Sequence, residues 1–130
     1  MRLLPSAAAV ALLAIVGSAA AGDSATSGRF QYAATVTKVV DGDTLDVRLV
    51  SGRAERIRLI GVDTPERGDC YSTQAGSRAR TLALGRSVTL RGDPTQDTRD
   101  RYDRLLAYVD VGRTDLGAAL IREGYGKVYV

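Results

Sequence analysis

Apolar and polar residues alternate along much of the chain from residue 30 onward, and this period of two predicts short strands. Residues 30–40, 45–49 and 56–61 each show the alternation. The turn sequences Asp41-Gly42 and Ser51-Gly52 separate them, and such pairs favour tight hairpin connections. The first half of the folded part is therefore predicted to be a three-stranded antiparallel meander.

The second half predicts two helices, at residues 73–84 and 116–122, because apolar residues recur there at helical spacing. It also predicts strands at residues 88–90 and 105–109 and a short edge strand at residues 128–130. Strands and helices in this order define an α+β fold class. The architecture that fits best is a five-stranded OB-type β-barrel with two helices.

The stretch from Arg58 to Glu66 places charged side chains at the end of a predicted strand. Alternation puts Arg58 on the face opposite its apolar neighbours. Pro65 cannot continue a central strand, so we expect the strand to end near Asp63. Polar groups that project from the end of a rigid element commonly form a functional site. We expect Arg58 to lie at the surface, where its substitution would cost little stability.

The N-terminal segment predicts export from the cytoplasm. Arg2, an uncharged stretch over residues 3–16 and the alanines at 19–21 have the pattern of a signal peptide at residues 1–21. An uncleaved membrane anchor is the alternative. Residues 22–28 are small and polar and predict a linker, which leaves residues 29–130 as the folded domain. We expect a secreted protein, extracellular or periplasmic, that is not bound to a membrane after cleavage.

Composition excludes several kinds of chemistry. The chain has no histidine, which removes Ser-His and Cys-His nucleophile pairs and His-ligated zinc. Its single cysteine, Cys70, cannot form an internal disulfide. The net charge of +3 is too small to indicate nucleic-acid binding by itself. Only Lys38 and Lys127 are lysines among 18 cationic residues; arginine suits phosphate contacts, but a GC-rich genome would give the same bias.

Three clusters of charged residues fall at predicted strand ends or loops, at residues 41–44, 58–66 and 99–104. An Asp-Gly-Asp turn is usually only a turn, and a charged loop is usually a solvated surface. The combination of the three clusters is a more specific signal of function than any one cluster alone. With histidine absent, catalysis by these clusters would have to use carboxylates, arginine, tyrosine or a hard metal ion.

Four ordered blocks in the chain resemble the staphylococcal nuclease family, also called thermonucleases. They are Val-Asp-Gly-Asp-Thr (40–44), Arg-Leu-Ile-Gly-Val-Asp-Thr-Pro-Glu (58–66), Asp-Arg-Tyr-Asp-Arg-Leu-Leu-Ala-Tyr-Val (100–109) and Leu-Ile-Arg-Glu-Gly-Tyr-Gly-Lys-Val (120–128). The resemblance runs from about residue 32 to residue 129. Asp103 stands where the family pattern has glycine, so we expect a carboxylate near the phosphate-binding arginines.

The resemblance implies a role for each matching residue. Asp43, Asp63 and the backbone carbonyl of Thr64 would bind Ca²⁺, and Glu66 would orient or deprotonate the attacking water. Arg58 and Arg104 would bind the scissile phosphate, and Tyr102 and Tyr129 would contact the nucleotide. The implied reaction is hydrolysis of DNA and RNA with little sequence specificity, leaving 3′-phosphates, by a monomer without a stable protein partner.

Elementary chemistry is consistent with these roles. A hard divalent cation prefers oxygen ligands, and guanidinium groups can bind a phosphate through paired hydrogen bonds. Two alternatives remain. One is a non-catalytic OB-type module that binds single-stranded nucleic acid, and the other is a secreted domain that Ca²⁺ only stabilises.

Overall fold

The structure is a computed structural model that describes residues 29–129. The predicted signal peptide and linker lie outside this range. Neither of the helices found within it has the length and apolar character needed to cross a bilayer.

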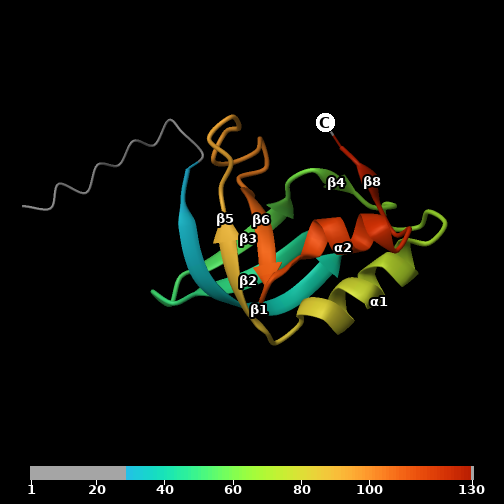
Figure 1. Ribbon diagram of the computed structural model, residues 1–130, viewed down its shortest axis with the longest axis horizontal. Coiled ribbons are helices and arrows are strands. Elements are labelled where there is room, and N and C mark those ends of the chain that lie inside the picture. The colour runs from blue at the N-terminus through green and yellow to red at the C-terminus, as the bar shows by residue number, and fades with distance from the viewer. Residues whose placement is uncertain (1–28, 130) are drawn as a thin grey trace, which may run out of the picture.

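Five strands form a closed barrel, which confirms the predicted OB-type architecture (Figure 1). They are β1 (Gln31–Asp41), β2 (Thr44–Leu49), β3 (Ala54–Leu59), β5 (Ser87–Arg91) and β6 (Leu105–Val111). Antiparallel pairing gives the order β3-β2-β1-β5-β6. Parallel pairing of β3 with β6, with Ile57 opposite Leu105, closes the barrel and leaves no long open edge.

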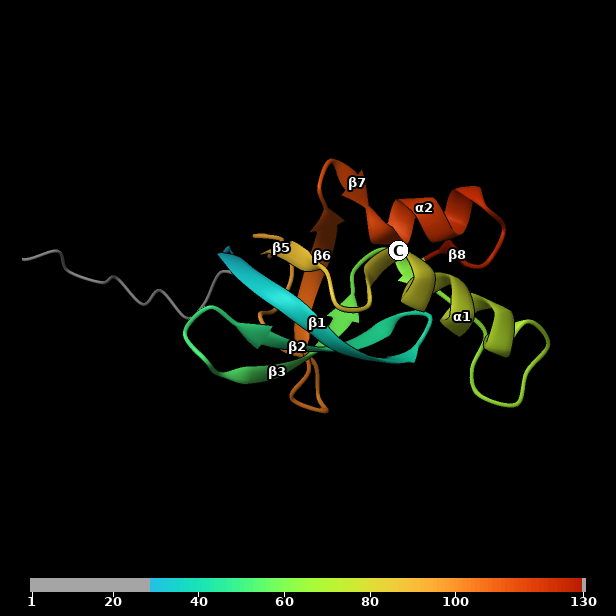
Figure 2. The same cartoon turned by 90° about the horizontal axis from the view of Figure 1, so that it is seen from below.

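Alternating apolar residues fill the barrel interior, as the sequence pattern predicts. The largest fully buried side chains are Leu45, Ile57, Leu90, Leu116, Leu120, Val36, Val47, Val62 and Val109. Strand β1 departs from strict alternation because its register with β2 shifts between Val36 and Lys38. A bulge of this kind bends a strand, and Figure 2 shows β1 curving around the barrel.

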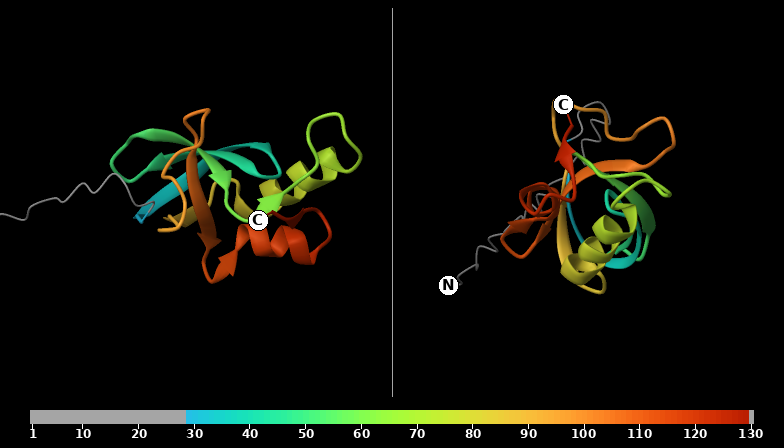
Figure 3. Two further views of the ribbon diagram at one scale, coloured as in Figure 1. Left: turned by 90° about the horizontal axis from the view of Figure 1, so that it is seen from above. Right: turned by 90° about the vertical axis from the view of Figure 1, so that its right-hand side faces the viewer.

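Both helices lie on the same side of the barrel (Figures 1 and 3). Helix α1 (Ser72–Ala83) packs against β1, and α2 (Leu116–Arg122) packs against β6 and α1. The buried face of α1 consists of small residues, including Ala75, Ala79 and Ala83, which allow a close approach to the sheet. Leu82, at a helical spacing from Ala75 and Ala79, is only partly buried.

The strand expected to end near Asp63 is divided in two, which corrects the sequence-based interpretation. Strand β3 ends at Leu59, and Gly61 turns the chain with a φ of 80°. A separate short strand, β4 (Val62–Asp63), then pairs with β8 (Lys127–Val128), which begins one residue before the predicted edge strand. A further short strand, β7 (Thr114–Asp115), pairs with β6. The division places Asp63 on a different element from Arg58.

Glu55 occupies one end of the barrel and is held by two arginines. Its side chain is only 9% exposed. Arg99 donates two hydrogen bonds of 2.8 Å to its carboxylate, and Arg53 donates two more. The hydrogen bonds from Arg99 lower the pKa of Glu55, although burial acts in the opposite direction, and Arg53 adds to the lowering.

We predict that Glu55→Gln lowers the free energy of unfolding at pH 7 by about 2 kcal/mol, because charged hydrogen bonds are lost at a buried position. A carboxylate whose pKa is lowered by folding stabilises the protein above its unfolded pKa, and this contribution disappears as pH falls through the folded value. The difference between the two proteins should therefore shrink below about pH 4 in urea titrations. Glu123→Gln, which breaks the more exposed pair with Arg78, is the control and should have a smaller effect. A pH-independent difference would contradict the prediction.

Candidate active site

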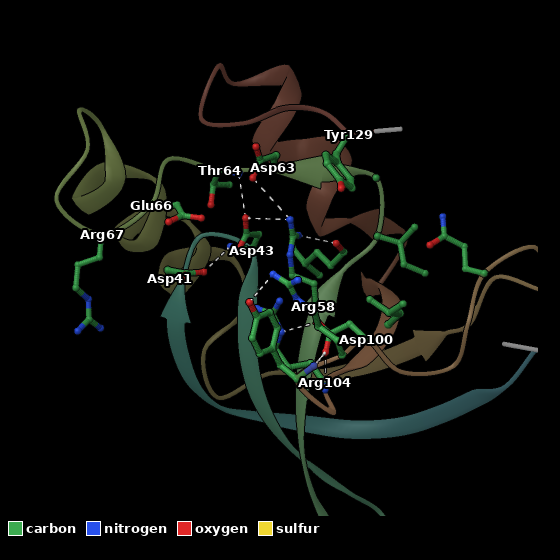
Figure 4. A pocket seen from close by; sticks show the side chains of 17 residues that line it. Asp41, Asp43, Arg58, Asp63, Thr64, Glu66, Arg67, Asp100, Arg104 and Tyr129 are labelled. Atoms are coloured by element: carbon green, nitrogen blue, oxygen red, sulfur yellow. Dashed lines mark hydrogen bonds and ion pairs between the residues drawn. The ribbon is translucent and has the colours of Figure 1, made fainter.

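One cavity of about 830 Å³ is lined by all eight residues predicted to form the site. The predicted residues are Asp43, Arg58, Asp63, Thr64, Glu66, Tyr102, Arg104 and Tyr129. Figure 4 labels all of them except Tyr102. Four distant parts of the chain contribute: the β1–β2 turn, the segment from β3 to Glu66, the loop before β6, and Tyr129 directly after β8.

Asp43 lies in the turn between β1 and β2 and is buried, with 8% of its surface exposed. Its carboxylate accepts a 3.0 Å hydrogen bond from the backbone N–H of Thr64 and a 3.2 Å bond from the Thr44 hydroxyl. Gly42 makes this approach possible, because a Cβ there would lie within 2.7 to 2.9 Å of three Thr64 side-chain atoms. The charged cluster at residues 41–44 is thereby fixed to the cluster at residues 58–66.

Arg58 links two of the three predicted metal ligands, Asp43 and Asp63. Its Nη1 donates 2.8 Å hydrogen bonds to the carbonyls of Leu59 and Val62. Its Nη2 lies 3.5 Å from Asp43 Oδ2 and 3.7 Å from Asp63 Oδ1. The side chain is only 15% exposed, so the expectation that Arg58 lies at the surface is wrong. The turn at Gly61 causes the difference, because it folds the Val62 carbonyl and Asp63 around the guanidinium.

Arg104 is positioned by Asp100, which the sequence analysis did not identify. Asp100 accepts hydrogen bonds from the backbone N–H of Arg104 at 2.9 Å and from its Nε at 2.7 Å. Burial raises the pKa of Asp100, but these hydrogen bonds outweigh it and keep the pKa below its usual value. Arg104 also donates to the Thr44 hydroxyl, at 3.3 Å, which directs its Nη1 toward the β1–β2 turn that carries Asp43.

The ring of Tyr102 is 64% exposed at the edge of the cavity. The guanidiniums of Arg101 and Arg104 lie 4.8 and 5.3 Å from its centroid. Arg101 also donates a 2.7 Å hydrogen bond to the Tyr102 hydroxyl. These contacts hold an aromatic surface next to the predicted phosphate-binding group.

Asp103 does not place a carboxylate beside the predicted phosphate-binding arginines, contrary to the sequence-based expectation. Its φ of 64° is in the left-handed region, which explains why the family pattern has glycine here. The side chain is 88% exposed, and its carboxylate lies 3.7 Å from Arg99. The backbone conformation thus directs this charge away from Arg104.

Glu66 and Tyr129 lie on either side of Asp63 in the view of Figure 4. Glu66 is exposed at the cavity wall, and no hydrogen bond or ion pair to its carboxylate occurs within residues 29–129. The ring of Tyr129 is 62% exposed, and its backbone N–H donates to the Gly61 carbonyl at 3.1 Å. Both side chains can therefore meet a ligand without first breaking a contact with the described part of the protein.

Asp41 is a further cavity residue that sequence reasoning treated only as part of a turn. Its carboxylate accepts a 3.1 Å hydrogen bond from the backbone N–H of Asp43. Burial and the nearby Asp43 carboxylate raise its pKa. Its place in the Val-Asp-Gly-Asp-Thr block was the signal that could have identified it.

The donors around Asp43 fit a hard cation. Asp41, Asp43 and Asp63 and the Thr64 carbonyl offer only oxygen atoms, the donors that Ca²⁺ and Mg²⁺ prefer. Burial is the main cause of the raised pKa of Asp41, and the Asp43 carboxylate adds to it; a positive ion would relieve the repulsion between these two carboxylates. Within residues 29–129 no three acidic, histidine or cysteine side chains form a complete metal site. A site here would therefore need the Thr64 carbonyl and non-protein ligands.

Comparison with known proteins agrees with this combination of barrel and site. The family model described as "Staphylococcal nuclease homologue" matches residues 56–130. Endonuclease YncB of Bacillus subtilis is 35% identical over 100 residues, which cover 72% of this chain and 46% of that protein. A thermonuclease of Staphylococcus intermedius is 35% identical over 98 residues, 71% of this chain and 56% of the relative. A micrococcal nuclease of Shigella flexneri is 31% identical over 103 residues, with coverages of 72% and 56%.

The fold and the cavity define an OB-type barrel with a combined carboxylate and guanidinium site. The chain belongs to the staphylococcal nuclease family, because the family model matches more than half of it. The matched region spans about half the length of these relatives.

We predict that Gly42→Ala lowers the free energy of unfolding by about 1–3 kcal/mol, because its Cβ would displace Thr64 from Asp43. Gly76→Ala in α1 is the matched control. There the nearest atoms to a new Cβ belong to the Arg80 guanidinium at 3.7 Å, so alanine should stabilise the helix by about 0.5–1 kcal/mol. Urea denaturation of both variants tests the sign of each change, and a neutral Gly42→Ala would contradict the close contact.

Proposed function

We propose that this chain is a secreted, Ca²⁺-dependent nuclease that hydrolyses phosphodiester bonds of DNA and RNA with little sequence specificity and leaves 3′-phosphates. The observation that carries the proposal is one cavity in which oxygen donors, two guanidiniums and the Glu66 carboxylate converge, and Glu66 has no ion pair within residues 29–129. The nuclease names of the relatives support it.

Asp43, Asp63 and the Thr64 carbonyl would hold the cation, with Asp41 beside them. When bound, Ca²⁺ would neutralise charge on the phosphate and favour ionisation of a nearby water. Asp43 is suited to this role because the Thr64 N–H and the Thr44 hydroxyl fix its orientation before any ligand arrives.

Arg58 and Arg104 would bind the scissile phosphate from the other side of the cavity. Arg58 Nη1 is held by two carbonyls, whereas its Nη2 has only long contacts with the carboxylates and can donate to a phosphate oxygen. Arg104 keeps its Nε on Asp100, which orients the remaining N–H groups. Two preorganised guanidiniums stabilise the negative charge that increases in the five-coordinate transition state.

Glu66 would act as the general base. Its carboxylate accepts a proton from water, the water oxygen forms a bond to phosphorus, and the bond from phosphorus to the 5′-oxygen breaks. The 5′-oxygen takes up a proton from solvent and Glu66 later releases its proton to solvent, so the products are a 3′-phosphate and a 5′-hydroxyl. The absence of histidine from the chain makes a carboxylate the natural choice for this step.

Tyr102 and Tyr129 would contact the sugar and base of the bound nucleotide. Both rings are exposed at the cavity, and stacking on an aromatic ring does not select a particular base. This arrangement supports broad substrate use.

The second candidate is an OB-type module that binds single-stranded nucleic acid without cleaving it. The barrel and the exposed tyrosines would serve either function. Glu66 is exposed in the same cavity as the oxygen donors and has no ion pair in the described part of the chain. This favours the nuclease, because binding of an anion would not need a carboxylate there.

We predict that purified protein degrades both plasmid DNA and RNA when Ca²⁺ is present and loses this activity in excess chelator. Gel electrophoresis of the digests measures the activity, and product end-labelling by a kinase tests for 5′-hydroxyls. Chelator-resistant cleavage would contradict the role of the cation. Binding of single strands without any cleavage would support the non-catalytic module instead.

We predict that Glu66→Gln lowers turnover at least about 100-fold with no loss of stability, since the side chain is exposed and unpaired in the described residues. Arg104→Ala should lower turnover as strongly, because a transition-state contact is removed. At Arg58, substitution by lysine is a better test than substitution by alanine. Arg58→Ala would remove a buried charge, leave Asp43 and Asp63 without their cation and also destabilise the fold. Steady-state kinetics together with urea denaturation separate these effects, and parallel losses of activity and stability in Glu66→Gln would refute its assignment.

A further inference from the structure

A second groove, of about 620 Å³, opens on the outside of the barrel between β3 and the loop that precedes β6. Figure 2 shows this loop extending past β3. We call it the β3 groove and define it by its lining residues: Arg53, Ala54, Glu55, Arg56, Arg99, Tyr102, Asp103 and Arg104.

The β3 groove adjoins the cavity of the proposed active site. Tyr102 and Arg104 line both of them. Arg56 and Arg58 are two residues apart on β3, so both project from the outer face of the same strand, about 7 Å apart. A chain molecule that places a phosphate between Arg58 and Arg104 can therefore continue over Tyr102 into the groove.

The lining of the β3 groove contains four arginines and two acidic residues, and Asp46 and Asp100 just outside it pair with Arg56 and Arg104. The groove therefore offers exposed guanidinium N–H groups that carboxylates hold in place. Glu55 is only 9% exposed and pairs with both Arg53 and Arg99. Its one carboxylate therefore orients two guanidiniums but neutralises the charge of only one. The Arg53 side chain is 63% exposed and that of Arg56 is 50% exposed. Asp46 holds Arg56 through a two-point contact of 2.7 and 3.1 Å, and this fixes the guanidinium on the outer face.

We propose that the β3 groove is a subsite for the phosphate backbone of the polynucleotide beyond the cleaved bond, with Arg53 and Arg56 as its phosphate-binding residues. The inference rests on the proposed function, because it takes the substrate to be a nucleic-acid strand. It adds that a strand long enough to reach the groove is bound more tightly than a dinucleotide. The exposed Tyr102 ring separates the two phosphate-binding regions and offers a surface on which a base can stack.

The test compares Arg53→Gln/Arg56→Gln with Arg113→Gln/Arg122→Gln. The control removes the same charge from exposed positions in the β6–β7 turn and the last turn of α2. Binding of fluorescent oligothymidylate and of a fluorescent thymidine dinucleotide is measured by anisotropy in EDTA over a range of salt concentrations. Binding in EDTA does not depend on cleavage.

The groove variant should lose about tenfold in affinity for oligothymidylate, and its ratio of long-strand to dinucleotide affinity should fall accordingly. The slope of log affinity against log salt should decrease by about 1.4, because two phosphate contacts to a single strand are removed. The control should retain the affinity of the unaltered protein. Asp46→Asn should raise the affinity, since it releases Arg56 from its ion pair.

Equal affinities of the groove variant and the control would overturn the subsite while leaving the nuclease proposal intact. Loss of affinity in the groove variant, in a protein that never cleaves DNA or RNA, would support the subsite and overturn the nuclease. Failure of the unaltered protein to distinguish oligothymidylate from the dinucleotide would also overturn the subsite.

Discussion

The buried carboxylate of Asp43 is the constraint on which the geometry of the site depends. A buried charge is stable only when it is paired or hydrogen-bonded, and Asp43 has the Thr64 N–H, the Thr44 hydroxyl and the Arg58 guanidinium around it. These contacts join the β1–β2 turn to the segment that follows β3. The barrel makes them possible, because pairing of β2 with β3 places Thr44 opposite Arg58. The register of β2 with β3 thus determines both the pairing in the barrel and the positions of the site residues.

Much of this arrangement follows from the sequence. Alternation of apolar residues is sufficient to predict the five barrel strands, because each has one face in a common core. The two helices follow from their helical spacing. The eight predicted residues of the cavity follow from the resemblance that the four sequence blocks carry, since a motif specifies both the residue types and their order. None of these predictions needs long-range information beyond the expectation that strand ends of a small barrel lie close together.

Other features depend on tertiary contacts that a local pattern does not contain. Alternation changes phase at Leu59-Ile60, where two buried residues are adjacent. The division into β3 and β4 also depends on pairing of β4 with β8, which comes from the far end of the chain and is not contained in this local pattern. The burial of Arg58 follows from that turn. Asp103 was misjudged because its direction depends on a left-handed φ, and Asp100 was overlooked because a loop aspartate gives no sign that it holds an arginine.

Arg58 illustrates how one side chain can serve both the fold and the proposed chemistry. In the structure Arg58 supplies the positive charge that faces Asp43 and Asp63. The proposed function assigns this same role to Ca²⁺. The two roles are compatible because the two terminal nitrogens of its guanidinium differ in their contacts. Nη1 is fixed by short hydrogen bonds to two carbonyls, while the contacts of Nη2 are long. A cation bound to the carboxylates would take over the neutralising role of Nη2 and leave it free for a phosphate, with the position of Arg58 unchanged.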